Sequence, residues 1–241
     1  MTTMTSEEKL QLEFNRWAEE GRGEEMERHH LPITEPVFHM MALRPGDRVL
    51  DLGCGAGWAT RLLARMVAAG KSNGHSDGGA LGVDISDEMI RRATENSREL
   101  NNVRYVVGSA EQIPSEANFF DKVLSVESFY YYPDQDRALD ELRRVMAPGG
   151  RLFILINLYA DNPYSLRWVE ELQVPVHARS QQEYVELLID HGFENVEAHR
   201  IPDPSPTPEE YTGKWFRNAE ELREFKRIGA LLLVASKPLA G

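Results

Sequence analysis

The chain has 241 residues, 41% of them hydrophobic, which is enough for the core of one α/β domain with a modest extra lobe. Its net charge of -12 argues against a nucleic-acid partner, because an acidic surface repels the phosphate backbone. A single cysteine, Cys54, excludes an internal disulfide and a cysteine-rich zinc site, so we expect no bound metal.

Targeting and membrane signals are not recognisable in the sequence. The first ten residues, MTTMTSEEKL, lack the basic and apolar regions of a signal peptide. The longest apolar runs, such as residues 231–235, are too short to cross a bilayer. We therefore expect a cytoplasmic protein, a monomer or a homodimer, that does not associate with membranes.

The N-terminal region is predicted to be helical. Thr5 and Glu8 have the spacing of a capping box that opens a helix, and Gly21 ends that helix. Apolar residues recur at helical spacing between these points: Leu10, Phe14, Trp17 and Ala18. A second, shorter helix is predicted from near Thr34, with Pro36 in its first turn, to the Arg-Pro-Gly turn before the first strand.

The apolar stripe of the first helix has to be buried, yet it precedes the sheet. The helix either packs permanently on the outside of the sheet or closes over a bound ligand as a lid. We favour residues 1–45 as a helical lid, because a lid excludes water from a reacting centre. In this arrangement Trp17 covers the bound ligand, Met26 lies nearby, and Gly21 and Gly23 supply flexible points.

From residue 46 onward, short apolar runs alternate with longer helical patterns, which is typical of a parallel sheet flanked by helices. Strands are predicted at 48–52, 80–84, 103–107, 122–126, 152–157, 196–201 and 230–236. Helices are predicted at 59–69, 87–100, 135–146 and 181–191, a surface loop at 71–79, and an aromatic insertion at 158–180. The predicted fold is α/β, one domain over residues 46–241 with a doubly wound, mostly parallel, seven-stranded sheet.

The strongest motif is VLDLGCGAGW at 49–58, an apolar strand that runs into glycines and a helix. Such a turn lets a ligand approach backbone N–H groups at a helix N-terminus. A dinucleotide fingerprint would need glycine three places after Gly55, where this chain has Trp58. Asp51 would stand poorly beside a pyrophosphate and favourably near an ammonium group. We therefore expect a ligand that carries a cation and lacks a diphosphate.

The second motif, GVDISD at 82–87, follows the next predicted strand. Asp84 ends that strand, where an acid can accept two hydrogen bonds from a ribose diol. Ser86 or Asp87 has the position of a helix cap. Met89, one turn into the helix, is either a cover for an adenine face or a core residue, and core methionines are the commoner case.

Three further segments complete a series: GSAEQIP at 108–114, FDKVLSVES at 120–128 and PGGRL at 148–152. In this order the motifs resemble those of class I S-adenosylmethionine-dependent methyltransferases, and most closely the small-molecule methyltransferases of the ubiquinone, menaquinone and sterol type. The resemblance covers residues 47–157. It implies S-adenosylmethionine as cofactor, S-adenosylhomocysteine as product, and a small-molecule acceptor of the methyl group.

The resemblance also implies site residues, with the cofactor between Asp51 and Glu127. The methionine part is expected to contact Asp51, Gly53, Gly55 and Gly57, with the Val126 carbonyl facing the ammonium group. The adenosine part is expected to contact Asp84, Ile85, Met89, Ala110 and Glu111. In one departure, many relatives have aspartate where this chain has Ser109, whose hydroxyl is a weaker acceptor for the adenine amino group.

The expected acceptor pocket is aromatic. Tyr130, Tyr131 and Tyr132 cannot all face inward on a helix or a strand, so at least one is expected to face the substrate. Further rings come from the insertion and from Tyr211, Trp215 and Phe216. In the insertion, Tyr159, Tyr164 and Trp168 form either a substrate wall or the core of the insertion itself. Aromatic walls suit a planar aromatic or a cationic acceptor.

A general base is needed only where the acceptor must lose a proton, and Glu127 and Tyr131 are the candidates. Asp121 is interpreted as a strand anchor and Cys54 as a small buried filler.

Two other classes of function remain open. A nicotinamide-dependent oxidoreductase is disfavoured by Trp58 and Asp51, whereas a protein that binds the cofactor without catalysis would share the same motifs.

Overall fold

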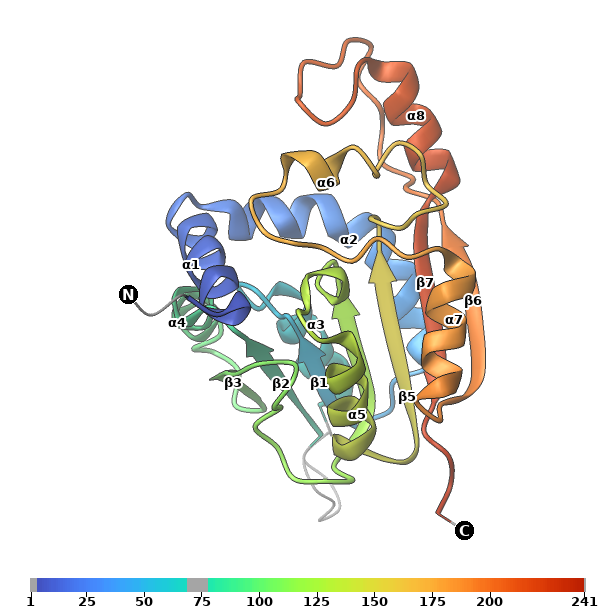
Figure 1. The fold of residues 1–241 in the computed structure, drawn as a ribbon. Helices are drawn as coiled ribbons and strands as arrows, with labels where there is room; N and C mark the ends of the chain where they lie inside the picture. The colour runs from blue at the N-terminus through green and yellow to red at the C-terminus, as the bar shows by residue number, and fades with distance from the viewer. Residues whose placement is uncertain (1–3, 69–77, 241) are drawn as a thin grey trace.

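Seven strands form one sheet in the order β3-β2-β1-β4-β5-β7-β6 (Figure 1). The structure is a computed structural model that describes residues 4–68 and 78–240. The strands are β1 (Arg48–Leu52), β2 (Gly79–Asp84), β3 (Val103–Val107), β4 (Phe120–Val126), β5 (Met146–Ile156), β6 (Glu194–Ile201) and β7 (Ala230–Ser236). The pairs from β3 through β5 are parallel, and β7 runs antiparallel between β5 and β6. The predicted α/β class and the mostly parallel seven-stranded sheet are confirmed.

Helices cover both faces of the sheet and gather at one of its ends. α2 (Arg22–Met41) and α3 (Trp58–Val67) pack on one face, while α5 (Gln135–Val145) and α7 (Gln181–Asp190) pack on the other. α4 (Asp87–Glu95) lies against β2 and β3. Near the carboxyl ends of the strands lie α1 (Ser6–Glu19), the 3-10 turn η1 (Phe129–Tyr131), α6 (Trp168–Glu171) and α8 (Ala219–Ile228) (Figure 1).

The alternation of side chains along β5 explains the two layers. Leu152, Ile154 and Ile156 pack with the α5 and α7 layer, and Phe153 and Leu155 pack with the α2 and α3 layer. All five side chains are fully buried. A strand covered on both faces therefore reads as a continuous apolar run, as parallel strands of α/β proteins do.

The strand order reverses at β1, because β2 and β3 lie on one side of it and β4 and β5 on the other. In open α/β sheets, ligands bind in the crevice at such a switch point, beyond the carboxyl ends of the strands. The motifs at 53–58, 84–87 and 108–114 all follow strands at this end.

The N-terminal prediction is half right. α1 begins with the Thr5 and Glu8 capping box, and Gly21, with a φ of 77°, separates it from the next helix. The second helix was expected near Thr34, and the structure instead starts it at Arg22 and carries it to Met41. Gly23, expected as a flexible point, therefore lies inside a helix.

Packing accounts for this longer helix. Each of Pro32 and Pro36 removes one helical N–H donor, which usually ends a helix. The side chains that follow along the same face are fully or almost fully buried against the sheet: Ile33, Val37 and Met41. Tertiary burial of an apolar face supplies most of the stability of a helix in a protein, and here it outweighs the two missing donors.

Other differences concern lengths and loops. The helix predicted at 87–100 ends at Glu95, with Asn96 as its cap. α6, α8 and η1 have no counterpart among the predicted elements. Most of the loop predicted at 71–79 lies outside the described residues.

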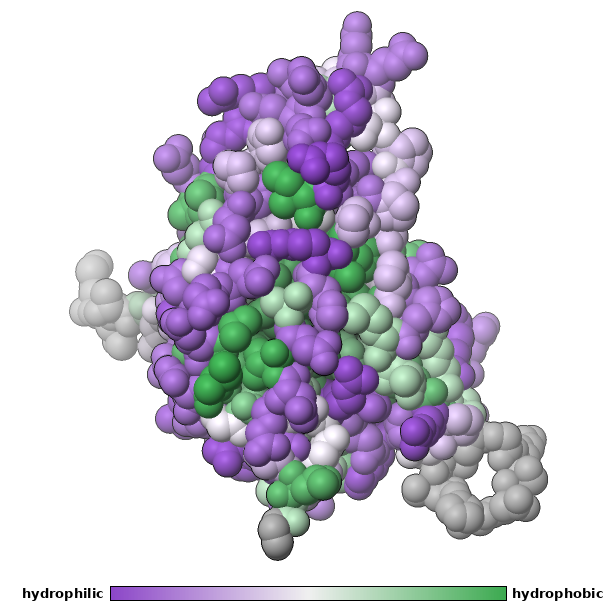
Figure 2. All heavy atoms as spheres, turned by 90° about the vertical axis from the view of Figure 1, so that its right-hand side faces the viewer, coloured by the Kyte–Doolittle hydropathy of each residue, from purple (hydrophilic) through white to green (hydrophobic). Residues whose placement is uncertain are grey.

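The side of the molecule that faces the viewer in Figure 2, where β6 forms the sheet edge, is covered mainly by hydrophilic residues, with separate apolar patches. Within residues 4–68 and 78–240, no helix combines the length and apolar character needed to span a bilayer.

Candidate active site

A cavity of about 840 Å³ lies over the carboxyl ends of the strands. Its walls come from the loops after β1, β2, β3 and β4, from α1 and α2, and from segments between Trp168 and Lys226. Every residue predicted to contact the cofactor or to act as a base lines this cavity except Asp51 and Gly57. Motifs that are far apart in the sequence thus share one space.

The turn after β1 depends on glycine. Gly53 has a φ of 77°, and a Cβ atom placed on it would lie 2.3 Å from Cβ of Ser128. Gly57 has the same φ, and its Cβ would lie 2.6 Å from the Tyr105 hydroxyl oxygen. Gly53 and Gly55 line the cavity, whereas Gly57 packs on Tyr105. The turn is therefore fixed from behind by the side chains of Tyr105 on β3 and of Ser128, which follows β4.

Two buried acids flank this turn. The carboxylate of Asp84 accepts hydrogen bonds from the N–H groups of Gly55 (2.8 Å) and Ser86 (2.9 Å). Asp84 also lines the cavity, and burial raises its pKa. Asp51 accepts a hydrogen bond from Thr60 Oγ1 (2.6 Å) behind the turn, and burial raises its pKa to about 7. Of these two acids, only Asp84 lines the cavity.

The end of the cavity beside β2 and β3 is small and mixed in character. The fully buried Met89 and the partly buried Ile85 supply apolar surface. The Ser109 hydroxyl accepts from the N–H of Glu111 (3.0 Å) and donates to the carboxylate of Glu7 on α1. Glu7 therefore belongs to this wall, and the sequence motifs do not reveal it.

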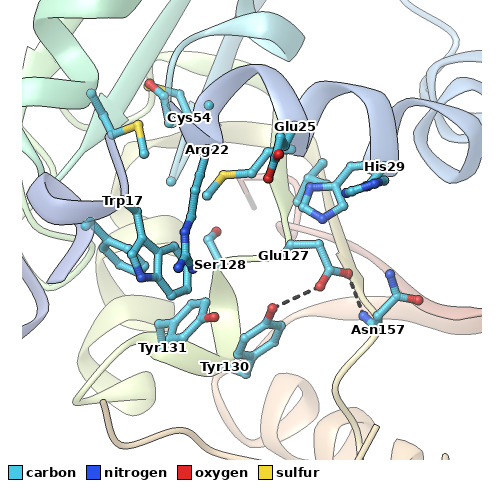
Figure 3. A pocket seen from close by; sticks show the side chains of 18 of the residues that line it. Trp17, Arg22, Glu25, His29, Cys54, Glu127, Ser128, Tyr130, Tyr131 and Asn157 are labelled. Carbon is cyan, nitrogen blue, oxygen red and sulfur yellow. Dashed lines mark hydrogen bonds between the residues drawn. The ribbon is translucent and has the colours of Figure 1, made fainter. Parts of the chain in front are cut away.

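Glu127 occupies the region beyond β4 with a left-handed φ of 53°. Its carboxylate accepts hydrogen bonds from the Tyr130 hydroxyl (2.9 Å) and from the N–H of Asn157 (2.6 Å), as Figure 3 shows. Burial raises its pKa to about 7, although both hydrogen bonds oppose the shift. A carboxyl group with this pKa can accept or release a proton near neutral pH.

The three tyrosines all face inward, contrary to the expectation. Tyr130, Tyr131 and Tyr132 are each buried, and each lines the cavity. The geometric limit for helices and strands does not apply, because the segment forms the 3-10 turn η1 and leaves it at Tyr132. The Tyr132 hydroxyl contacts Ser128 Oγ (2.9 Å), so this ring also supports the glycine turn.

The N-terminal helices cover the middle of the cavity. Trp17 lines it and packs edge-on against Tyr131, with ring centroids 6.2 Å apart. The Arg22 guanidinium carbon lies 4.9 Å from the centre of the Trp17 ring (Figure 3). A Cβ on Gly23 would lie 2.8 Å from Cβ of Ala56, so the start of α2 touches the glycine turn.

α2 adds polar side chains that the motif series does not include. Glu25 and His29 point into the space above Glu127 (Figure 3), and the partly buried His30 also lines the cavity. Burial lowers the pKa of His30 to about 4, so its imidazole is neutral at pH 7. Both histidines therefore belong to the cavity wall, with His29 exposed and His30 partly buried.

α1 is attached to the sheet domain along a polar row. Glu7, Gln11 and Asn15 are spaced four residues apart and so lie on one face of the helix. The Asn15 side chain contacts Ser86 Oγ (2.6 Å) and donates to Asp87 (2.8 Å), and Gln11 donates to Asp87 (3.5 Å). The spacing of this row was visible in the sequence and would have revealed which face of α1 meets the sheet domain.

The far end of the cavity is aromatic. Trp168 contacts Trp215, Phe216 and Phe225, with ring centroids between 5.3 and 6.1 Å apart. Tyr211 packs on Phe216 at 5.5 Å, and all five rings line the cavity. Two other rings of the insertion do not line it. Tyr159 is fully buried and donates to the carbonyl of Gly229 (2.8 Å), and Tyr164 is partly buried.

Two interpretations outside the cofactor contacts are confirmed. Asp121 accepts hydrogen bonds from the backbone and the guanidinium group of Arg48, so it anchors the start of β1 against β4. Cys54 is buried, and burial raises the pKa of its thiol well above the ordinary value.

Among residues 4–68 and 78–240, no cluster of three or more His, Cys, Asp or Glu side chains could hold a metal ion.

Comparisons with known proteins agree with this geometry. The family model for a methyltransferase domain matches residues 50–154. The ubiquinone/menaquinone biosynthesis C-methyltransferase of Vibrio cholerae is 36% identical over 115 residues, which span 46% of this chain and 42% of that enzyme. The chain thus matches less than half the length of that relative.

Two broader matches reach further along the chain. The 27-O-demethylrifamycin SV methyltransferase of Amycolatopsis mediterranei is 30% identical, over 83% of this chain and 70% of that enzyme. A chain from the complex of the Haloferax volcanii Trm112 methyltransferase activator with a methyltransferase has a TM-score of 0.84 and 30% identity. That alignment covers 94% of this chain and 98% of the other, so it extends well beyond residues 50–154.

Proposed function

Since the chain belongs to the class I S-adenosylmethionine-dependent methyltransferases, we propose that it transfers a methyl group to a small aromatic acceptor by in-line displacement. The observation that carries this proposal is the position of Asp84, whose carboxylate reaches the cavity beside the glycine turn. A carboxylate there suits a ribose diol, and the close backbone of the turn suits the neighbouring amino-acid end of the cofactor.

The lining residues fit the cofactor along its length. Asp84 would accept hydrogen bonds from the ribose hydroxyls, and Ile85 and Met89 would contact the adenine faces. Gly53 and Gly55 would face the methionine part, with the Val126 carbonyl toward its ammonium group. Ser109, Ala110 and Glu111 would border the adenine edge. We assign Asp51 and Gly57, which lie behind the turn, a supporting role in holding it.

When bound, S-adenosylmethionine supplies an electrophilic methyl group on a positively charged sulfur. Positive charge on sulfur disperses during transfer, so the protein chiefly has to align the two partners and exclude water. The rings of Trp17 and Tyr131 would exclude water from the reacting groups. The carboxylate of Glu127 would accept a proton from an acceptor that must lose one, with the Tyr130 hydroxyl and the Asn157 N–H holding it in position.

The acceptor would lie at the aromatic end of the cavity. Trp168, Trp215 and Phe216 offer ring faces and edges that suit a planar molecule. Two relatives carry names that refer to quinone biosynthesis and to a rifamycin. The reference to quinone biosynthesis supports a planar ring as acceptor rather than a small aliphatic amine.

α1 and the first turns of α2 would act as the lid. The second half of α2 is buried in the core, so only the segment before it is available to open. Tryptophan fluorescence and limited proteolysis of residues 1–30, each with and without S-adenosylhomocysteine, test this role. We expect protection by the ligand. Equal protection in both states, with full activity after Trp17→Ala, would reduce α1 to ordinary packing.

A protein partner is the second proposal. The Haloferax volcanii match comes from a complex with the Trm112 methyltransferase activator and covers almost all of both chains. We propose that this chain binds an activator of the same type. Analytical ultracentrifugation of the chain mixed with Haloferax volcanii Trm112 should show a species heavier than either protein. Sedimentation of two independent species would argue against it.

A methyl-transfer assay tests the function. The purified chain is incubated with S-adenosylmethionine labelled in its methyl group and a panel of phenols, quinones and amines. We expect label to move to an aromatic member of the panel. Tight binding of S-adenosylhomocysteine without transfer to any member would favour a binding protein. Binding of a nicotinamide dinucleotide in its place would favour an oxidoreductase.

A further inference from the structure

The contact between Glu7 and Ser109 joins residues 102 positions apart at the β3 end of the cavity. Glu7 lies in the first turn of α1, is partly buried, and lines the cavity. The Ser109 hydroxyl donates to Oε1 of Glu7. Among the described residues, no hydrogen bond reaches the second carboxylate oxygen of Glu7. A carboxylate is thus held at the cavity wall with one acceptor atom open.

The other carboxylates at this end are engaged by backbone donors. Asp84 accepts from the N–H groups of Gly55 and Ser86, and its remaining capacity is assigned to the ribose. The carboxylate of Glu111 accepts from the N–H of Asp134 (2.9 Å). The Glu111 carboxylate is tied in this way to Asp134, the N-cap residue of α5, whereas Glu7 is the acid that the Ser109 hydroxyl itself holds.

An adenine ring that enters this end brings an exocyclic amino group, which is a hydrogen-bond donor without acceptor ability. Burying such a donor without a partner costs free energy, whereas an ionised acceptor gives one of the stronger hydrogen bonds. The Ser109 hydroxyl already donates to Glu7 and accepts from the Glu111 N–H. It is therefore suited to positioning Glu7 rather than to binding the base itself.

We propose that Glu7 is the specificity-determining acceptor for the adenine amino group, held in position by Ser109; this inference rests on the proposed function. Its consequence concerns α1 as a whole. Glu7 and Trp17 belong to the same helix, and Gln11 and Asn15 attach it to the start of α4. Recognition of the base at one end of α1 is therefore tied to covering the reacting groups at the other end.

Calorimetry with two ligands tests the inference on the full chain. The ligands are S-adenosylhomocysteine and its 6-deamino analogue, which carries purine in place of adenine. We expect the unmodified chain to prefer S-adenosylhomocysteine by roughly ten- to a hundredfold, the range for a hydrogen bond to a charged group. Glu7→Ala should reduce the preference to less than about threefold by removing that acceptor.

Asn15→Ala is the matched control, because it cuts the attachment of the same helix without touching the base. It should weaken both ligands by the same factor and leave the preference intact. A second variant, Glu7→Ala combined with Ser109→Asp, returns a carboxylate to the same wall from the β3 side and should restore the preference.

Two outcomes would overturn the inference. In the first, Glu7→Ala keeps the preference of the unmodified chain. In the second, Glu7→Ala weakens both ligands equally, as Asn15→Ala does, which would make Glu7 an attachment residue only. If the unmodified chain binds neither ligand, the proposed function fails together with the inference, and that result differs from both of the others.

Discussion

The half of the cavity above β1 and β2 is formed by backbone turns, whereas the half between α6 and α8 is formed by side chains. In the first half, glycines with positive φ values and the N–H groups that hold Asp84 define the surface. In the second half, five aromatic rings from segments that are distant in the sequence pack on one another. A backbone-built surface tolerates little change, while a surface built from side chains can vary with the acceptor.

The largest effect is expected at the glycine turn. Gly53→Ala adds strain at a φ of 77° and drives a Cβ atom against Ser128. Gly21 has the same φ with nothing within 4 Å of its Cβ position, so Gly21→Ala measures the strain alone. We expect losses of about 3–5 kcal/mol at Gly53 and about 1–2 kcal/mol at Gly21 in chemical denaturation. Equal losses would mean that Ser128 does not constrain the turn.

The next effect concerns ligand affinity. Asp84→Ala should weaken binding of S-adenosylhomocysteine by about 2–4 kcal/mol, because two hydrogen bonds to a carboxylate are lost. Glu95→Ala, which removes an exposed carboxylate at the far end of α4 and away from the cavity lining, is the control and should change affinity little. Calorimetry on both variants decides the matter. Unchanged affinity in Asp84→Ala would remove this acid from the ribose site.

The third prediction concerns Glu127. Its effect should appear in the dependence of kcat on pH. With its pKa raised to about 7, the carboxyl group is mostly protonated at pH 6 and mostly ionised at pH 8. If the ionised form accepts a proton from the acceptor, kcat rises with pH through about 7 and then levels. Glu127→Gln should abolish this rise and lower kcat by about a hundredfold. A rise that persists in the variant would exclude Glu127 as the base.

Glu127 should also affect the stability of the fold, which is expected to fall as the pH rises, whereas kcat is expected to rise. Because its pKa in the folded state lies above the ordinary value of 4.5, the folded chain binds more protons than the unfolded chain between about pH 4.5 and 7. The contribution of Glu127 to stability therefore falls as the pH rises through this window. We therefore expect the free energy of unfolding of Glu127→Gln, measured by chemical denaturation, to fall less than that of the unmodified chain between about pH 4.5 and 7.

The smallest effect is expected from single aromatic residues at the acceptor end. Trp215→Ala removes one ring of five and should raise the KM for the acceptor by about tenfold, or about 1–2 kcal/mol, without changing affinity for S-adenosylhomocysteine. Tyr164→Ala, in the insertion but away from the cavity lining, should leave both constants unchanged. Loss of cofactor affinity in Trp215→Ala would contradict the division of the cavity into two halves.

The same division separates what the sequence predicts from what it does not. The strands at 48–52, 103–107 and 230–236 have the bounds that were predicted, because apolar runs bounded by glycine or polar turns are local signals. The turn at Gly53 and the acid at Asp84 follow from the same local patterns.

The remaining features depend on packing between distant segments. α2 continues through Pro32 and Pro36 because its other face is buried against the sheet, which no window of sequence records. The inward orientation of Tyr130–Tyr132 follows from a 3-10 turn that has no distinctive pattern. Glu7 meets Ser109 only because α1 folds back over the sheet, and a polar row at four-residue spacing was its sole local signal.

A crystal structure of the chain grown with S-adenosylhomocysteine tests the division of the cavity most directly. We expect the ribose hydroxyls on Asp84, the adenine between Ile85 and Met89, and the sulfur facing Glu127 and Tyr131, with the space beside Trp168 and Trp215 left free for the acceptor. A ligand whose ribose lies away from Asp84, or one seated among the aromatic rings, would contradict it.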